Sequence, residues 1–192
     1  MSNYFDIPAL HYSQKDLFQY YSNNTNAWAV YGDDSINSLY TQYADITNPI
    51  INTILNQFVD KHIIENVKFF KTKAKGTVKP HCDKRNVAIN IPIQTNDKSY
   101  TVFYENIGDY ENPNIIIDGQ TSQVTAKRFT DVKELEKLII TGATCLNTNV
   151  PHGVINNSEE DRIILSISFV DKFDDFDTIK DLYNSGNLTR TQ

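Results

Sequence analysis

The sequence contains little cysteine and no long apolar run. Two cysteines in 192 residues are too few for the disulfide framework of a small secreted scaffold, so Cys82 and Cys145 are predicted to be reduced, buried side chains. No segment approaches the length that crosses a bilayer, and the first residues lack the basic and then apolar stretches of a secretion signal. These absences predict a cytoplasmic protein with no membrane partner.

An excess of positive charge is also missing. The 24 Asp and Glu residues outnumber the 18 Lys and Arg residues, which gives a net charge of −6 and a pI near 5.1. This balance provides no strong signal for nucleic-acid binding. Five lysines form a local exception, and we interpret them as the solvated face of a strand: Lys68, Lys71, Lys73, Lys75 and Lys79. Nothing in the sequence indicates an oligomeric state.

Length and composition predict one domain. With 40% hydrophobic and 22% charged residues, the composition is that of an ordinary globular protein, and 192 residues can bury a sizeable core. We divide the domain into a helical part (1–64), a β core (65–170) and a C-terminal helix with its tail (171–192).

Helical patterns occur near both ends of the chain. Ser13 is a predicted N-cap for a helix over 14–22, and Pro49 opens a second helix that extends to about Asp60. Residues 174–184 predict a short third helix. The apolar faces expected for the first two helices are Leu17, Phe18 and Tyr21, and then Ile50, Ile51, Ile54, Leu55 and Phe58. Residues 131–138 fit a helix or a strand.

Short strand-like runs separated by turns fill the middle of the chain. The clearest are 67–71, 87–93, 149–155 and 163–170. Many short strands with intervening turns are typical of a β-sandwich or a jelly roll.

A His-x-Asp pair and a distant histidine carry the strongest chemical signal. Side chains two residues apart on a strand face the same way, so His81 and Asp83 would present an imidazole and a carboxylate to one point. His152, from another β-prone run, would complete a set of two histidines and one carboxylate, an arrangement that suits non-haem Fe(II). The alternative is that these are three unrelated surface or turn residues.

With these residues, the sequence resembles the 2-oxoglutarate- and Fe(II)-dependent oxygenase superfamily over about residues 66–170. It is most similar to the prolyl-hydroxylase-like and aspartyl/asparaginyl-hydroxylase-like branches, which include uncharacterised phage and bacterial proteins. The matching positions are Gly76, His81, Asp83, Asn90-Ile91-Pro92, Gly142, Leu146-Asn147-Thr148, His152-Gly153-Val154, Asn156 and Arg162. One departure is Ile164, which stands where some branches have serine two residues after the arginine; Ser166 and Ser168 follow further along.

The resemblance implies a mainly β fold, namely a double-stranded β-helix (a jelly roll, cupin-like). N-terminal helices would pack on its major sheet, and the metal-binding stretches would belong to the minor sheet. His81, Asp83 and His152 would hold Fe(II), and Arg162 would bind the far carboxylate of the co-substrate 2-oxoglutarate. With O₂, such an enzyme hydroxylates a C–H bond of a small molecule or a protein side chain and releases succinate and CO₂.

Six further residues are candidates for the same site. Asn90 and Ser166 are predicted to help bind 2-oxoglutarate, although Asn90 would equally fit a structural bond to nearby backbone. Arg85, Tyr100, Tyr104 and Trp28 are candidates for the substrate pocket, with core packing as the alternative for the three aromatic residues.

A different functional class also fits the ligand set. A cupin-like protein could bind a metal without oxygenase activity, as an isomerase or a small-molecule-binding module. Arg162 discriminates between the two classes, because such a protein has no need for a buried carboxylate receptor ten residues after the second histidine.

Overall fold

The computed structural model describes residues 2–24, 29–30, 39–111, 115–117, 120–122 and 127–190. Two antiparallel sheets dominate these residues: a larger sheet of order β1-β13-β6-β15-β4-β3-β2 and a smaller sheet of order β12-β7-β14-β5-β11-β8. The larger sheet consists of β1 (Tyr4–Asp6), β2 (Ala29–Val30), β3 (Leu39–Tyr43), β4 (Ile64–Thr72), β6 (Val87–Gln94), β13 (Thr144–Asn147) and β15 (Arg162–Phe169). The smaller sheet consists of β5 (Thr77–Cys82), β7 (Ser99–Asn106), β8 (Tyr110–Glu111), β11 (Lys127–Phe129), β12 (Val132–Leu138) and β14 (His152–Asn156). A separate pair joins β9 (Ile115–Ile117) to β10 (Gln120–Ser122).

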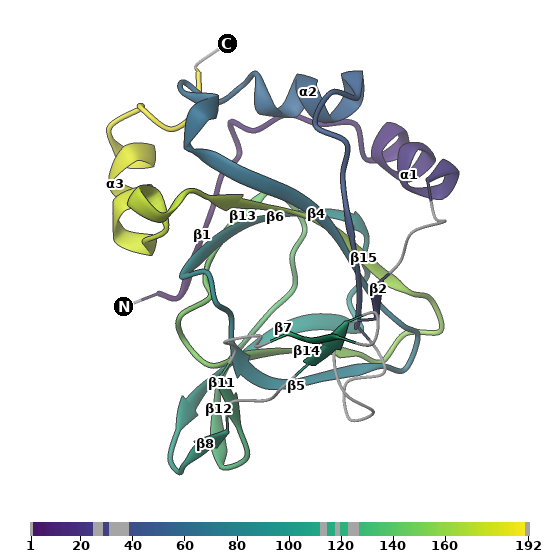
Figure 1. Ribbon diagram of the computed structural model, residues 1–192, viewed down its shortest axis with the longest axis vertical. Helices are drawn as coiled ribbons and strands as arrows, with labels where there is room; N and C mark the ends of the chain where they lie inside the picture. The colour runs from purple at the N-terminus through teal and green to yellow at the C-terminus, as the bar shows by residue number, and fades with distance from the viewer. Residues whose placement is uncertain are drawn as a thin grey trace.

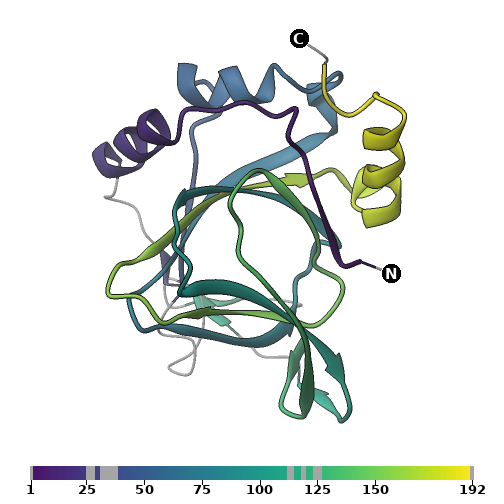
Figure 2. The ribbon, with the colours of Figure 1, turned by 180° about the vertical axis from the view of Figure 1, so that it is seen from behind.

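In the part of the chain that the structure describes, three α-helices cover the outer face of the larger sheet, with the smaller sheet on the opposite side (Figures 1 and 2). They are α1 (Gln14–Asn23), α2 (Pro49–Leu55) and α3 (Phe176–Asn184); short 3₁₀ turns, η3 (Lys61–Ile63) and η4 (Asp171–Phe173), precede β4 and α3. Apolar side chains from the helices and from the outward face of this sheet form the main core, including Leu17, Ile51, Ile54, Phe69, Ile89, Ile91, Leu165, Ile167 and Ile179. The predicted jelly roll, with N-terminal helices on its major sheet, is confirmed.

The predicted starts of α1 and α2 are confirmed, but the predicted buried face of α1 and the predicted end of α2 differ from the structure. The Ser13 and Asn48 side chains accept hydrogen bonds from the first turns of α1 and α2, as their positions before the helices require. Within α1, however, Tyr20 is buried and Phe18 is 43% exposed, so Phe18 was wrongly assigned to the buried face.

The second helix ends at Leu55 rather than near Asp60. The chain turns there because Phe58 forms a bridge with Thr189 and its fully buried ring packs in the main core. Residues 131–138, which fit either structure, contain strand β12, because this segment pairs with β7 along most of its length. Here the tertiary pairing decides between two local preferences.

The inward face of the larger sheet is more polar than its outward face. On β15, Ile163, Leu165 and Ile167 pack under the helices, whereas Arg162 and Ile164 line a cavity between the sheets. This alternation follows from the two-residue period of a strand. Among the described residues, no helix combines the length and apolarity needed to cross a membrane.

Candidate metal centre

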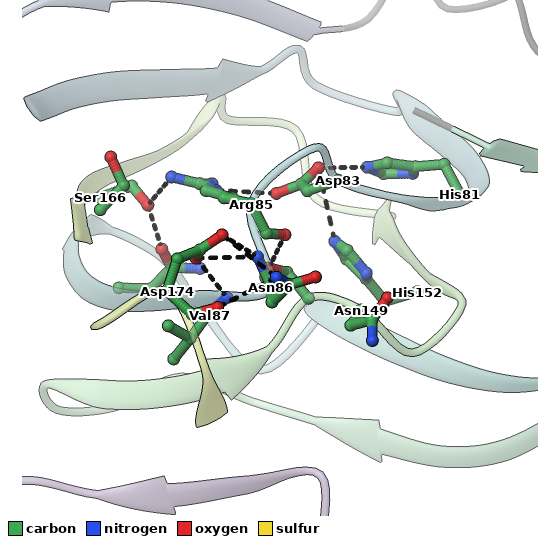
Figure 3. Close-up of polar contacts among 12 residues, drawn as sticks. His81, Asp83, Arg85, Asn86, Val87, Asn149, His152, Ser166 and Asp174 are labelled. Atoms are coloured by element: carbon green, nitrogen blue, oxygen red, sulfur yellow. Dashed lines mark hydrogen bonds and ion pairs between the residues drawn. The ribbon is translucent and has the colours of Figure 1, made fainter. Parts of the chain in front are cut away.

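The three predicted ligands meet at one point on the smaller sheet (Figure 3). His81 lies near the end of β5, Asp83 follows that strand directly, and His152 begins β14, where it pairs with His81 across the ladder. One ligand atom from each residue lies within 4.8 Å of the others. Asp83 Oδ1 is 3.3 Å from His81 Nε2 and 4.0 Å from His152 Nε2. The structure therefore brings two imidazole nitrogens and one carboxylate oxygen together.

Backbone carbonyl groups fix both imidazole rings. His81 Nδ1 lies 2.8 Å from the Lys79 carbonyl oxygen, and His152 Nδ1 lies 2.9 Å from that of Val150. Because a carbonyl oxygen can only accept, Nδ1 is the donor in each of these contacts, and Nε2 is the ring nitrogen that faces Asp83. Histidine ligands of metals are commonly oriented in this way.

Burial and neighbouring charges set the protonation of the three groups. Burial, reinforced by the nearby His81, lowers the pKa of His152 to about 4. Burial also acts to lower the pKa of His81, but the hydrogen bond and charge of Asp83 outweigh it and raise that pKa overall. Burial opposes ionisation of Asp83, yet Arg85 and His81 hold its pKa well below the usual range. At neutral pH the site thus presents an ionised carboxylate and a neutral His152.

The segment that carries Asp83 is attached to two distant parts of the chain. The Asp83 amide donates to the Thr148 carbonyl oxygen, and the Thr148 hydroxyl donates to the Arg85 carbonyl oxygen. The Asp174 carboxylate accepts from the backbone amides of Asn86 and Val87 at 2.9–3.2 Å (Figure 3). These bonds fix the position of Asp83 beyond the last residue of β5.

Gly153 allows His152 to sit close to the neighbouring strand. A Cβ at this position would lie 2.6 Å from the Val78 carbonyl oxygen, a distance that requires the backbone to shift. The pairing of β14 with β5 is irregular at the same place, between His152 and Val154. Cys82, which precedes Asp83, donates its thiol to the Asn149 carbonyl oxygen, and burial raises its pKa to about 11. It is therefore a protonated structural thiol, as predicted.

Next to the three ligands lies a cavity of about 390 Å³ that contains the Arg162 side chain. Arg162 is buried; its Nη2 donates to Thr101 Oγ1 at 3.1 Å, and its Nε has no partner among the described residues. The cavity wall combines apolar residues such as Leu39, Val78, Val154 and Ile164 with polar and charged residues such as Asn66, Lys68 and Asn90. Burial lowers the pKa of Arg162 to about 10, which still leaves it charged at neutral pH. A buried, incompletely paired guanidinium is costly, so this end of the cavity suits an anion.

A second polar group occupies another part of the cavity wall. Arg85 reaches from the segment after Asp83 to Ser166 on β15, and Ser166 donates to Asn90 on β6. Ser166 is four residues along the strand from Arg162, a separation of roughly 13 Å at the rise of a β-strand. Ser166 and Asn90 were predicted beside the co-substrate; in the structure Ser166 contacts both Arg85 and Asn90, and Asn90 lines the cavity that contains Arg162.

Two of the predicted pocket residues, Tyr100 and Tyr104, are absent from the cavity wall that the described residues form. Tyr100 and Tyr104 alternate with Thr101 and Phe103 along β7, so they project from the other face of the sheet, where the Tyr100 hydroxyl accepts from Asn157. Trp28 lies outside the described residues. Conversely, Lys68 was interpreted as a solvated residue but lines the cavity, with its Nζ 4.5 Å from the centre of the Tyr43 ring.

Sequence reasoning missed the residues that support the ligands. Thr101, which is hydrogen-bonded to Arg162, directly follows the pocket candidate Tyr100, but no sequence motif marks this threonine. Asp174 is 88 residues from Asn86 in sequence, and its place within an acidic stretch gave no sign of its partner.

Comparisons with known proteins agree with this fold. No protein-family model matches the sequence, and no curated protein matches it. The structure is similar to the non-haem α-ketoglutarate-dependent epimerase SnoN from nogalamycin biosynthesis, with a TM-score of 0.59 and 9% identity over 88% of this chain and 78% of that one. It is also similar to a prolyl hydroxylase from Trichoplax adhaerens, solved with a peptide of hypoxia-inducible factor (TM-score 0.58, 8% identity, 90% and 85% of the two chains). A third similar structure is HygX from Streptomyces hygroscopicus, solved with nickel, 2-oxoglutarate and hygromycin B (0.51, 10%, 86% and 82%). At these identities the similarity establishes a shared fold.

Proposed function

We propose that the protein is an Fe(II)- and 2-oxoglutarate-dependent dioxygenase that hydroxylates a C–H bond. The observation that carries the proposal is the buried Arg162, with an unpaired Nε, in the same cavity as the His81, Asp83 and His152 ligand set. Two histidines and a carboxylate suit Fe(II) with open coordination positions. The guanidinium suits a carboxylate, which it can bind through two parallel hydrogen bonds.

Each residue then has a defined task. His81 and His152 offer Nε2 to the metal because their Nδ1 protons are engaged by backbone carbonyl groups. Asp83 offers Oδ1, which faces both imidazoles. Arg162 and the Thr101 hydroxyl, which are hydrogen-bonded to each other, would hold the 5-carboxylate of 2-oxoglutarate.

Bound together, the metal and the co-substrate would supply oxygen activation, with release of succinate and CO₂. The protein's own contribution is to orient the co-substrate toward the metal and to leave one side of the site open for the substrate. SnoN is described as an epimerase and the Trichoplax enzyme as a hydroxylase, so the fold accommodates more than one outcome. We propose hydroxylation, for which the product would gain the mass of one oxygen atom.

The size and polarity of the cavity favour a small polar substrate or a protein side chain. Its volume of about 390 Å³ is that of an ordinary small-molecule site. Away from Arg162, its wall includes the polar side chains of Asn66, Lys68, Asn90 and Ser168. A fully apolar substrate would take these polar groups out of water without offering them hydrogen bonds.

Formation of succinate from 2-oxoglutarate tests the function. We expect the purified protein to form succinate when Fe(II), 2-oxoglutarate and O₂ are all present, and to lose this activity when any one is left out. His81→Ala and Asp83→Ala should abolish tight Fe(II) or Mn(II) binding without unfolding the chain. Undiminished metal content in His81→Ala/His152→Ala would refute the metal site. Metal binding by the wild type with no succinate and no affinity for 2-oxoglutarate would favour the cupin-like alternative.

A further inference from the structure

Arg85 links the proposed metal ligand Asp83 to the opposite sheet. Its Nε lies 2.9 Å from Asp83 Oδ2, the carboxylate oxygen that does not face the histidines. Its Nη1 donates to Ser166 Oγ at 3.1 Å, and Ser166 in turn donates to Asn90 Oδ1 at 2.6 Å. Figure 3 shows Arg85 extended between Ser166 and Asp83.

The anchor for Arg85 is rigid because it is built from neighbouring strands of the larger sheet. Ser166 belongs to β15 and is fully buried, and Asn90 faces it across the ladder on β6. The Phe70 ring on β4, the other neighbour of β15, lies 5.2 Å from the guanidinium carbon. The guanidinium is thereby held at both ends, on the larger sheet and on Asp83.

Asp83 needs such support because it lies beyond the last residue of β5. Its amide is bonded to Thr148, but its side chain can still rotate. A carboxylate that turned both oxygens to a metal would occupy two coordination positions. Arg85 prevents this turn by keeping Oδ2 in a hydrogen bond, so that Oδ1 alone faces His81 and His152.

We propose that Arg85 is a positioning residue that, through Ser166 and Asn90, holds Asp83 as a single-oxygen metal ligand. This inference rests on the proposed metal centre, but it does not require 2-oxoglutarate chemistry. It gives Ser166 and Asn90 a role in supporting a ligand rather than in binding the co-substrate.

Arg85 can affect metal binding in two ways, and the two predict opposite changes in Mn(II) affinity when Arg85 is removed. Its positive charge repels a divalent cation, so a purely electrostatic role predicts that Arg85→Ala binds metal more tightly. A positioning role predicts weaker binding, because residues that orient metal ligands typically contribute about 10- to 100-fold in metal affinity. The direction of the change separates the two roles.

The test is a titration of Mn(II) into the metal-free full-length protein, followed by electron paramagnetic resonance. We expect Arg85→Ala to weaken Mn(II) affinity by about 10- to 100-fold and to change the Mn(II) spectrum as the second Asp83 oxygen is released. Arg85→Lys should recover part of the affinity, because an ammonium keeps one contact but lacks the fork that spans Asp83 and Ser166. Ser166→Ala should shift affinity in the same direction by a smaller factor.

Lys84→Ala is the matched control. Lys84 is adjacent in sequence and lines the same cavity, while the ion pair to Asp83 is made by Arg85. Removing its charge should leave Mn(II) affinity unchanged or slightly raised. Circular dichroism of each metal-free variant verifies folding, and Ser166→Ala and Arg85→Lys carry the test if Arg85→Ala does not fold.

The outcomes distinguish this inference from the proposed function. Unchanged or tighter Mn(II) binding in folded Arg85→Ala and Ser166→Ala, with an unaltered spectrum, would overturn the role of Arg85 and leave the oxygenase proposal standing. If the wild type forms no succinate but these variants still bind Mn(II) more weakly, the role of Arg85 would stand and the oxygenase proposal would not. In an active wild type, Arg85→Ala at saturating metal should lower kcat more than it changes the KM for 2-oxoglutarate.

Discussion

At the scale of single residues, the position of His152 depends on the absence of a side chain at Gly153. Gly153→Ala would place a Cβ 2.6 Å from the Val78 carbonyl oxygen. We expect the variant to lose about 1–3 kcal/mol in its free energy of unfolding, as overpacking typically costs, and to bind Mn(II) more weakly because His152 moves with the strand. Urea denaturation and Mn(II) titration measure the two effects.

The control for this substitution is Gly142→Ala. A Cβ at Gly142 would meet no atom within 4 Å, so this variant should keep the wild-type stability and metal affinity. If both alanine variants behaved alike, the close approach at Gly153 would not explain the need for glycine.

The two cysteines provide a second prediction at this scale. Both are buried, and burial raises the pKa of each thiol, so neither offers a thiolate to a metal at neutral pH. Cys82→Ser and Cys145→Ala together should leave the Mn(II) affinity within about threefold of wild type, since thiolate ligands are not part of the site. Loss of metal from a folded double variant would show that a ligand has been wrongly assigned.

Some residue-level features could be predicted from the sequence and others could not. His81 and Asp83 were predicted to share a face by strand alternation alone, and they do so although Asp83 lies just past β5. The partners of Arg85 could not be predicted, because Ser166 is 81 residues away and the bond depends on how the two sheets face each other.

At the scale of secondary-structure elements, the segment before α3 is bonded to the residues next to the candidate metal centre. The Asp174 carboxylate accepts bonds from the backbone amides of Asn86 and Val87, next to Arg85. Asp174→Ala should lower the free energy of unfolding by about 1–3 kcal/mol, because partly buried amides lose their acceptor. It should also weaken Mn(II) binding, because the segment that carries Asp83 and Arg85 is loosened. Thermal denaturation and Mn(II) titration of the variant test both effects.

Asp181→Ala serves as the control, since Asp181 is an exposed residue of the same type on α3. It should change neither stability nor metal affinity appreciably. An equal effect of the two substitutions would mean that net charge, and not the bonds of Asp174, is responsible.

Local signals predicted some elements better than others. The Ser13 cap and the Pro49 start gave the beginnings of α1 and α2 because capping is a property of a few adjacent residues. The end of α2 and the nature of β12 depend on contacts with Thr189 and with β7, which lie far away in sequence. Such contacts leave no periodic pattern at the segment itself.

At the scale of the whole molecule, the two-sheet architecture was predictable because strand-like runs recur from about residue 66 to 170. Under the proposed function, the two histidine ligands and the co-substrate receptor come from opposite sheets: His81 and His152 from the smaller, Arg162 from the larger. The offset of ten residues between His152 and Arg162 spans the connection from β14 to β15 and crosses the cavity. The polar lining beyond Arg162 was not predictable, because it combines inward-facing residues of several strands.

Titration of 2-oxoglutarate into the Mn(II)-loaded protein without oxygen, for the wild type, Arg162→Ala and Arg162→Lys, tests the central claim most directly. The loss of one partner from a buried charge pair costs about 2–5 kcal/mol, so Arg162→Ala should weaken 2-oxoglutarate binding by roughly 30-fold to several thousand-fold. Arg162→Lys should recover only part of the affinity, and Mn(II) binding should hardly change in either variant. Equal affinity for 2-oxoglutarate in the wild type and Arg162→Ala would contradict the account.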